Sequence, residues 1–214
     1  DKGFTPKVIL NYLSLLGWNP DSEKEIFDQN ELINSFQFKQ VQKKSAVFDE
    51  KKLLWISQQH LSEMSVRDLM NEIYTLNPEW GDGLEWDYLK EVVKLIKDRS
   101  KTITEITSMS EIFFKDKLEY DIDLLNKTFN DKSIAIIKDF QSALSSIEDW
   151  SRVEIEKIFE DIMEQHEVAI GQVMKPVRVA ISGIPFGPGI FDLILLLGKE
   201  ICQIRLRHAL SVIQ

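Results

Sequence analysis

The stretch Gly171–Glu200, which reads GQVMKPVRVAISGIPFGPGIFDLILLLGKE, decides how the end of this chain folds. It consists of two apolar arms, 173–181 and 190–197, joined by the turn sequence SGIPFGPG. Five of the nine glycines and three of the six prolines of the chain lie in these thirty residues. Glycine tolerates positive φ, whereas proline fixes φ and withholds an N–H. We therefore expect a stiff, tightly shaped turn. Positive φ is available at its three glycines, Gly183, Gly187 and Gly189.

The second arm predicts a helix, because Pro188 and Gly189 precede it, apolar residues recur along it, and Gly198 is a natural stop. The first arm is less ordinary, since Arg178 stands among apolar residues shortly after a proline. Two interpretations of Arg178 stay open. Its guanidinium reaches water or an acidic partner, or a rigid helix end presents the planar donor fork to a ligand.

Two sets of residues, one at each end of the chain, match motifs of a single family. Near the C-terminus stand PVRVAISG at 176–183, PGIF at 188–191 and LLGKE at 196–200. Near the N-terminus stand GFTP at 3–6, NYL at 11–13, LLGW at 15–18, EIF at 25–27, AVFD at 46–49 and KL at 52–53. Both sets resemble bacterial-type glutamyl-tRNA synthetases, the second in the segment shortly after the KMSKS-type loop. The two matches occur in the right order and together cover the whole chain.

The resemblance implies an all-α fold with two helical anticodon-binding subdomains, preceded by the end of a stem-contact domain. We expect the stem-contact part over residues 1–68, the first anticodon-binding subdomain over 69–125 and the second over 126–214. The residue pattern agrees, because helical spacing of apolar residues recurs and no strand pattern is long enough to build a sheet.

Capping residues indicate where several helices begin. Thr5, followed by Pro6, predicts a helix that runs to Gly17. Further N-caps are expected at Asp28, Asp49, Ser65 and Ser151. Longer amphipathic helices are expected over 85–98, 131–147 and 153–166. The segment 38–48, which contains Lys43 and Lys44, is expected to be irregular and solvated.

The resemblance also implies which residues contact the anticodon: Arg99, Arg178, Gly187, Pro188 and Ile190. Arg178 and the turn that follows it would hold the second and third bases, and Arg99 the first. Asp98 stands where the family usually has a proline. Gly187 stands where some relatives have a hydroxyl side chain, so only its backbone is available for a contact. From its charged surroundings alone, Arg99 is equally consistent with a solvated side chain.

The net charge of −9 is unfavourable for RNA binding, so the distribution of charge matters. Residues 171–214 carry five basic residues against two acidic ones, a local charge of +3. A phosphate backbone responds to such a local field. Arg205 and Arg207 either belong to this basic surface or simply cover the solvent face of the last helix. No basic cluster flanks four of the tryptophans, which we expect to pack rather than stack on bases: Trp55, Trp80, Trp86 and Trp150.

Composition bounds the remaining possibilities. A chain of 214 residues with 43% apolar residues can build a core. Its single cysteine, Cys202, excludes an internal disulfide and predicts a buried, inert thiol. The most apolar window, 177–197, is interrupted by charges, glycines and prolines, which argues against a membrane span. The chain begins with Asp1, shows no signal peptide and reads as a fragment. We expect a cytoplasmic monomer that does not contact membranes.

The sequence contains no catalytic motif. It lacks a glycine-rich phosphate loop and metal-ligand spacings such as His-x-x-x-His or Cys-x-x-Cys, and its three histidines are isolated. We therefore expect no catalytic residue, metal or cofactor in this chain. By resemblance, the intact enzyme uses ATP and magnesium, and its HIGH and KMSKS-type motifs would lie upstream of Asp1. This chain alone should be inactive.

The function that the resemblance implies is tRNA anticodon recognition by the C-terminal part of a glutamate–tRNA ligase, an enzyme that attaches glutamate to its tRNA. The expected partner is glutamate tRNA, and whether glutamine tRNA is also a partner stays open. The alternative is a helical protein–protein interaction module without RNA binding. That alternative predicts weak salt dependence and no preference among anticodons.

Overall fold

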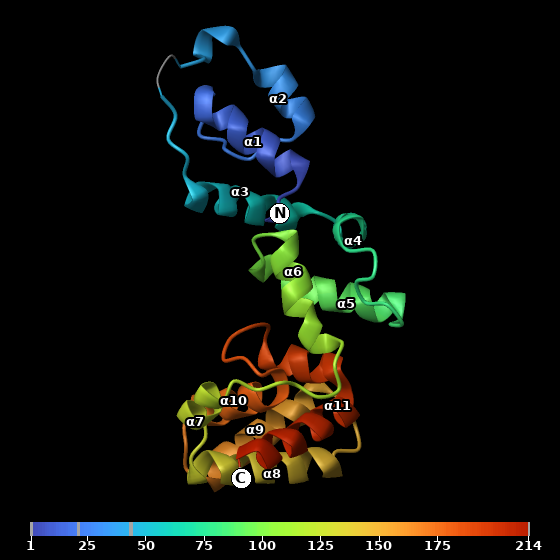
Figure 1. The fold of residues 1–214 in the computed structure, drawn as a ribbon. Helices are drawn as coiled ribbons and strands as arrows, with labels where there is room; N and C mark the ends of the chain where they lie inside the picture. Colours follow the sequence, from blue (N-terminus) through green and yellow to red (C-terminus); the bar gives the residue numbers. More distant parts are fainter. Residues whose placement is uncertain (1, 21, 43–44, 214) are drawn as a thin grey trace. The chain divides into compact units, whose positions relative to one another are not determined.

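The computed structural model describes residues 2–20, 22–42 and 45–213, and its regular structure is helical (Figure 1). Over these residues the backbone forms no strand, and a single antiparallel bridge pairs Trp18 with Val41. The all-α class expected from the sequence is confirmed. Lys43 and Lys44, assigned above to an irregular segment, lie outside the described residues.

The chain divides into two compact units, Asp1–Ser110 and Glu111–Gln214, called unit 1 and unit 2 below. Unit 1 contains α1 (Pro6–Gly17), α2 (Gln29–Ser35), the 3-10 turn η1 (Phe38–Gln40), α3 (Glu50–Glu63), α4 (Val66–Leu76), α5 (Trp86–Ile96), η2 (Lys97–Arg99) and α6 (Ile103–Ser110). Unit 2 contains η3 (Glu111–Phe113), α7 (Ile122–Thr128), α8 (Asp131–Ser146), α9 (Arg152–Gln165), α10 (Ile170–Ser182) and α11 (Ile190–Ile213). The finer division at residues 68 and 125 stays a prediction.

The predicted N-caps lie at the starts of their helices. The Thr5 hydroxyl accepts a hydrogen bond from the Val8 N–H, and Pro6 is the first residue of α1. Side chains likewise accept from first-turn N–H groups at the starts of α2, α3, α4 and α9: Asp28, Asp49, Ser65 and Ser151. These bonds satisfy donors that have no partner inside the helix. The local sequence therefore sets where these helices begin.

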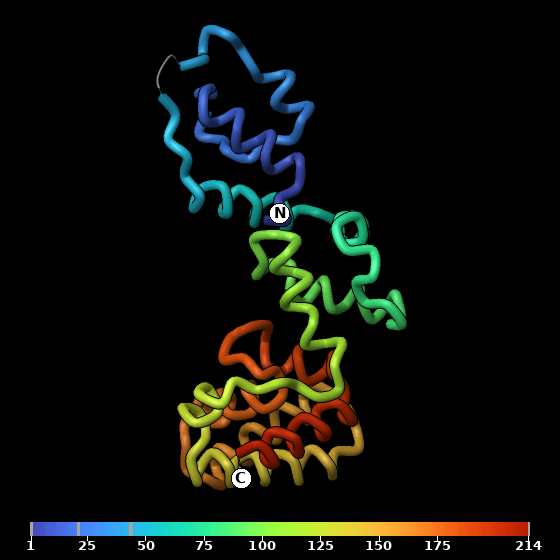
Figure 2. The backbone as a smooth tube through the Cα atoms, in the orientation of Figure 1, coloured from blue at the N-terminus to red at the C-terminus, as the bar shows by residue number. Residues whose placement is uncertain are grey.

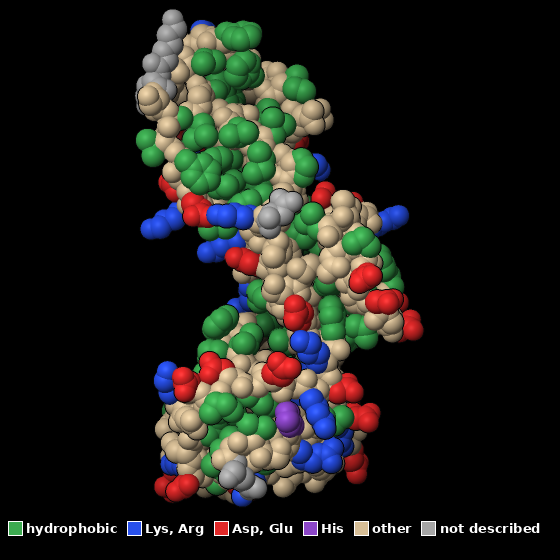
Figure 3. Space-filling model, viewed as in Figure 1, with side chains coloured by type: hydrophobic (Ala, Val, Ile, Leu, Met, Phe, Trp, Pro, Cys, Tyr) green, Lys and Arg blue, Asp and Glu red, His purple; other side chains and the backbone are tan. Residues whose placement is uncertain are grey.

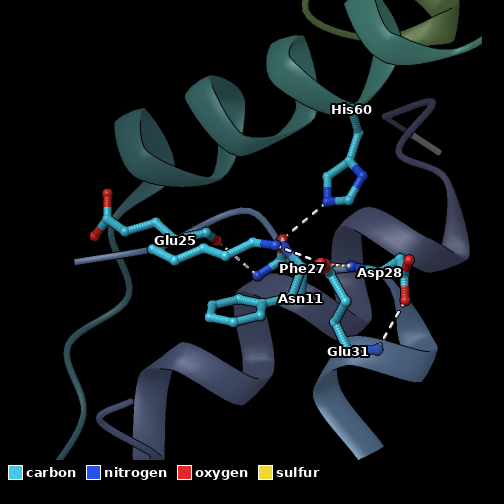
Figure 4. Close-up of polar contacts among 7 residues, drawn as sticks. Asn11, Glu25, Phe27, Asp28, Glu31 and His60 are labelled. Carbon is cyan, nitrogen blue, oxygen red and sulfur yellow. Dashed lines mark hydrogen bonds and ion pairs between the residues drawn. The ribbon is translucent and has the colours of Figure 1, made fainter. Parts of the chain in front are cut away.

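The N-terminal motifs meet in one polar network in unit 1 (Figure 4). Asn11 in α1 is fully buried, and its Nδ2 donates to the Glu25 carbonyl at 2.9 Å. Its Oδ1 accepts from the Phe27 N–H at 3.0 Å and from His60 Nε2 in α3 at 2.8 Å, which places a proton on Nε2. One amide side chain thus joins α1, the loop before α2, and α3.

Tyr12 fastens the start of α3 to α1. Its hydroxyl accepts from the Asp49 N–H at 2.6 Å, while the Asp49 carboxylate accepts from the Lys52 N–H at 3.0 Å. The Tyr12 ring also meets Phe48 edge-on, with ring centroids 5.5 Å apart. Apolar residues of α1 and α3 form the core around it: Val8, Leu53 and Ile56.

The four tryptophans expected to pack differ in how deeply they are buried. Trp80 is buried and Trp150 is half-buried, and each donates its indole N–H to an oxygen of the protein. Trp55 and Trp86 are less buried and leave 42% and 43% of their surface exposed. Trp86 nevertheless stacks on Tyr74, with nearly parallel rings whose centroids lie 5.9 Å apart.

Unit 2 is a bundle in which α8, α9, α10 and α11 pack against one another (Figure 1). Three aromatic rings link three of its helices, since Phe159 meets Phe140 and Phe191 edge-on at 4.9 and 5.2 Å. Cys202 is fully buried in this core, as predicted, and burial raises the pKa of its thiol to about 12. Such a thiol is not reactive at neutral pH.

Arg205 in α11 is fully buried, so both surface roles considered for it from the sequence were wrong. Its Nη1 donates to the Ile181 carbonyl at 2.7 Å, and its Nη2 donates to the carbonyls of Ile112 and Lys115, both at 2.5 Å. A guanidinium carries five donors in a fixed fork, so one side chain can satisfy several carbonyls of irregular backbone. This buried arginine therefore holds the segment 111–121, which runs across the bundle (Figure 2), to the end of α10.

Candidate nucleic-acid interface

The turn between α10 and α11, residues 182–189, is shaped by its glycines. Gly183 ends α10 in the left-handed region with a φ of 74°, and its N–H donates to a carbonyl one turn earlier at 2.9 Å. Gly187 has a φ of 139°, whereas Gly189 does not take a positive φ. Farther along, Gly198 interrupts α11 with a φ of 79°, but the chain then resumes a helix instead of stopping. Positive φ was therefore correctly expected in the turn, at two of its three glycines.

Arg178 braces this turn from inside α10. Its Nη1 donates to the Pro188 carbonyl at 2.8 Å, and its own carbonyl accepts from the Ser182 hydroxyl at 2.8 Å. A Cβ built on Gly187 would lie 3.7 Å from Arg178 Nη1, so the turn passes close to the guanidinium. The Arg178 side chain is half-buried. Its carbonyl partner was not among those considered from the sequence.

The first turn of α11 fixes the other side of the turn. Asp192 accepts a hydrogen bond from Arg152 Nη1 at 2.8 Å, and a carboxylate at this end of a helix is favoured by the helix dipole. Arg152 also lies over the Phe191 ring, 5.3 Å from its centroid. A Cβ built on Gly189 would lie 2.6 Å from Asp192 Oδ2, so a side chain there would displace the carboxylate. A side chain at position 189 is therefore opposed by the place of the Asp192 carboxylate and not by the backbone φ.

The side chains of the turn differ in exposure. Pro188 is buried and Ile190 is 4% exposed, so these two predicted site residues offer backbone groups and support more than side-chain surface. Phe186 is 71% exposed on the same turn. Sequence reasoning missed it, although an aromatic residue between two prolines of a turn was a visible signal. An exposed aromatic face is a surface on which an unstacked RNA base can lie.

Arg99 lies in unit 1, at the end of η2. Lys97 Nζ donates to two carbonyls near the end of α3 at 2.9 and 3.1 Å, and Gln58 Nε2 donates to the Asp98 carbonyl at 3.2 Å. These bonds hold η2 to α3 and leave the Arg99 side chain exposed. The remaining predicted site residues lie together in unit 2: Arg178, Gly187, Pro188 and Ile190.

Over the part of the chain that the structure covers, no group of three or more His, Cys, Asp or Glu side chains could hold a metal ion. None of the helices described here is long and apolar enough to cross a bilayer.

Comparison with known families defines the class of protein. Residues 57–210 match the family described as anticodon binding domain, which is most of the chain, so the chain belongs to this family. Residues 1–55 match the family described as tRNA synthetases class I (E and Q), catalytic domain. The two matches follow one another along the chain in the order expected from the sequence.

The individual relatives are glutamate–tRNA ligases, which confirms the resemblance seen in the motifs. Over the whole length of this chain, 32% of residues are identical to those of the ligase of Flavobacterium johnsoniae, and the match covers 42% of that protein. The chain is 36% identical to the ligase of Desulforudis audaxviator over 98% of its length and covers 44% of that protein. A solved glutamate tRNA ligase from Elizabethkingia meningosepticum superimposes with a TM-score of 0.87 at 26% identity, over 99% of this chain and 42% of that one. The chain thus spans less than half the length of these relatives.

Proposed function

We propose that this chain recognises the anticodon of glutamate tRNA, as the C-terminal part of a glutamate–tRNA ligase. The observation that carries the proposal is the turn 182–189, which Arg178 braces and from which Phe186 projects with 71% of its surface exposed. Proteins read single-stranded RNA by splaying its bases out, stacking them on aromatic rings and binding their edges through fixed donors and acceptors. A braced turn with an exposed ring suits that task.

Each predicted site residue then has a role that fits its surroundings. Arg178 and the backbone of the turn hold the second and third anticodon bases, with Gly187 contributing through its backbone. Pro188 and Ile190 support the turn from the protein interior, because their side chains are buried. Arg99, which η2 presents with its side chain exposed, contacts the first base.

The proposal extends to the intact protein. The intact protein attaches glutamate to its tRNA, as the names of the relatives indicate, and uses ATP and magnesium in its catalytic part. The chain alone would then form no aminoacyl-tRNA. The protein works as a cytoplasmic monomer, and glutamine tRNA is a second substrate that the binding experiment below can include.

A titration of the chain with glutamate tRNA, and with the same tRNA carrying a substituted anticodon, tests the proposal. We expect tighter binding to the cognate anticodon. A bidentate arginine–base contact contributes about 1–3 kcal/mol of discrimination, so Arg178→Ala should reduce the preference roughly tenfold to a hundredfold. The matched control is Arg67→Ala, which removes an exposed arginine from α4 in unit 1 and should leave the preference unchanged.

Thermal unfolding of both variants shows whether the fold survives the substitutions. An Arg178→Ala variant that stays folded and keeps the full preference would rule out the base-contact role. Equal affinity of the unaltered chain for both tRNAs, with little salt dependence, would favour the helical protein-interaction module instead.

A further inference from the structure

A second cluster of basic side chains lies on unit 2, away from the residues assigned to base contacts. Five residues line a cavity of about 390 Å³ there: Lys117, Ile204, Arg207, His208 and Ser211. This cavity is called the basic pocket below. Figure 3 shows lysine and arginine side chains gathered beside a histidine on this unit. From the sequence, two roles were open for Arg207: it belongs to a basic surface that faces RNA, or it covers the solvent face of the last helix.

The two cations of the basic pocket come from segments about ninety residues apart in the sequence, and the fold holds them together. His208 Nε2 donates to the carbonyl of the residue that follows Lys117, at 3.1 Å. Arg205 Nε donates to the carbonyl of the residue that precedes Lys117, at 3.4 Å. Both neighbours of Lys117 are therefore bonded to α11, the helix that carries Arg207. The pairing of the two cations is built into the packing of unit 2.

The two cations of the basic pocket lack a paired acidic side chain in the part of the chain that the structure describes. No acidic residue is among those that line it in the described chain. Neither Lys117 nor Arg207 forms an ion pair with any residue that the structure covers, whereas Lys115 and Arg152 of the same unit do. Two cations that line one pocket repel each other, and Asp116 and Glu119, which flank Lys117 in the sequence, do not line the pocket with it. A pair of cations without an ion-pair partner among the described residues is suited to an anionic ligand.

One residue links the basic pocket to the turn 182–189. The Tyr120 hydroxyl donates to the Ala180 carbonyl at 2.5 Å, two residues before the turn begins. The Tyr120 ring also lies 5.5 Å from the ring of His208, which lines the basic pocket. Tyr120 thus contacts both the end of α10, which leads into the turn, and a residue that lines the basic pocket.

We propose that the basic pocket binds a backbone phosphate of the same RNA whose anticodon is read at the turn. The inference rests on the proposed function and adds a contact that carries no sequence information. Arg207 offers a planar fork that matches two phosphate oxygens, and Lys117 adds a compact charge. Such contacts fix the position of a strand, while base contacts determine its specificity. The ligand is thus a phosphodiester group in single-stranded RNA next to the anticodon.

The test compares the double variant Lys117→Gln/Arg207→Gln with a control of equal charge, Lys138→Gln/Lys157→Gln, which removes two exposed lysines from α8 and α9. Binding of glutamate tRNA and of its anticodon-substituted form is measured over a range of potassium chloride concentrations. We expect the double variant to bind both RNAs about tenfold more weakly at low salt, with the preference between them unchanged. The slope of log K against log salt should flatten by about 0.7, the value for one phosphate contact in a single strand. The control should keep the slope of the unaltered chain.

Each outcome separates this inference from the proposed function. If the double variant keeps the affinity and slope of the unaltered chain, the phosphate contact is wrong, while a retained anticodon preference leaves the proposed function standing. If the unaltered chain shows no preference but the double variant still flattens the slope, the phosphate contact stands and anticodon reading fails. If the slope of log K against log salt flattens equally in the control, the phosphate contact is wrong and the change reflects only the loss of total charge. Absence of tRNA binding by the unaltered chain overturns both.

Discussion

Arg205 is the residue whose loss should damage unit 2 most, and the variant Arg205→Met tests this. The arginine is fully buried, and its two terminal nitrogens donate hydrogen bonds to three carbonyl oxygens at 2.5–2.7 Å. Methionine fills a similar volume without any N–H group, so the substitution removes the donors and leaves the packing volume largely intact. The expected damage comes from carbonyls left without partners.

The magnitude follows from those three acceptors. A buried polar group left without its partner costs about 1–3 kcal/mol, so three carbonyls set a gross loss of roughly 3–9 kcal/mol. Removing a buried charge and admitting water to the gap both offset part of that cost. We therefore expect Arg205→Met to lower the free energy of unfolding of unit 2 by about 3–5 kcal/mol. Arg205→Lys keeps the charge but not the planar fork of donors, so its free energy of unfolding should lie between those of the unaltered chain and of Arg205→Met.

Urea unfolding followed by circular dichroism measures the change. The control is Arg207→Met, two residues along α11, where the side chain is exposed and the expected change is within about 0.5 kcal/mol. A loss below about 1 kcal/mol for Arg205→Met would refute the reasoning, because it would mean that the segment 111–121 does not depend on these hydrogen bonds.

Three further predictions concern unit 1 and the turn. Burial lowers the pKa of His60 from its ordinary value of 6.5, so the unfolded chain takes up this proton at a higher pH than the folded chain does. Unit 1 should therefore lose stability as the pH falls through about 6.5. His60→Gln, which can still donate to Asn11, should weaken this dependence in thermal unfolding measured on either side of that pH. Gly187→Ala should cost about 1–3 kcal/mol in urea unfolding because of its φ of 139°, whereas Gly171→Ala, which meets no neighbour, should be neutral or slightly stabilising. Phe186→Ala should leave stability unchanged but weaken binding to glutamate tRNA by about 1–3 kcal/mol, and undiminished affinity would exclude base stacking there.

Features that depend on neighbours in the sequence were predictable. Thr5 with Pro6 located the start of α1, and the other N-caps located theirs, because a cap acts within one turn of helix. The turn 182–189 was expected to be tight because glycine and proline determine backbone geometry where they stand. The all-α class agrees with such local rules, whereas the place of the site was expected from the resemblance to a known family and stays a prediction.

Features that depend on distant contacts were not predictable in the same way. Arg205 occupies a helix position like any other in the sequence, and its burial results from carbonyls as far as 93 residues away. Likewise, the partner of Arg178 is a carbonyl that only the closed turn brings to it. Exposure of Phe186 and of Trp55 depends on which elements pack beside them, and a single sequence does not contain that information.

If the turn between α10 and α11 receives the anticodon, its backbone amides should be protected when the tRNA binds, and hydrogen exchange measures that protection residue by residue. Amide exchange of residues 182–190 is measured in the chain alone, with glutamate tRNA, and with the tRNA carrying a substituted anticodon. We expect slower exchange in the turn with the cognate tRNA and clearly less slowing with the substituted one. Equal slowing by both tRNAs, or slowing confined to other parts of the chain, would contradict it.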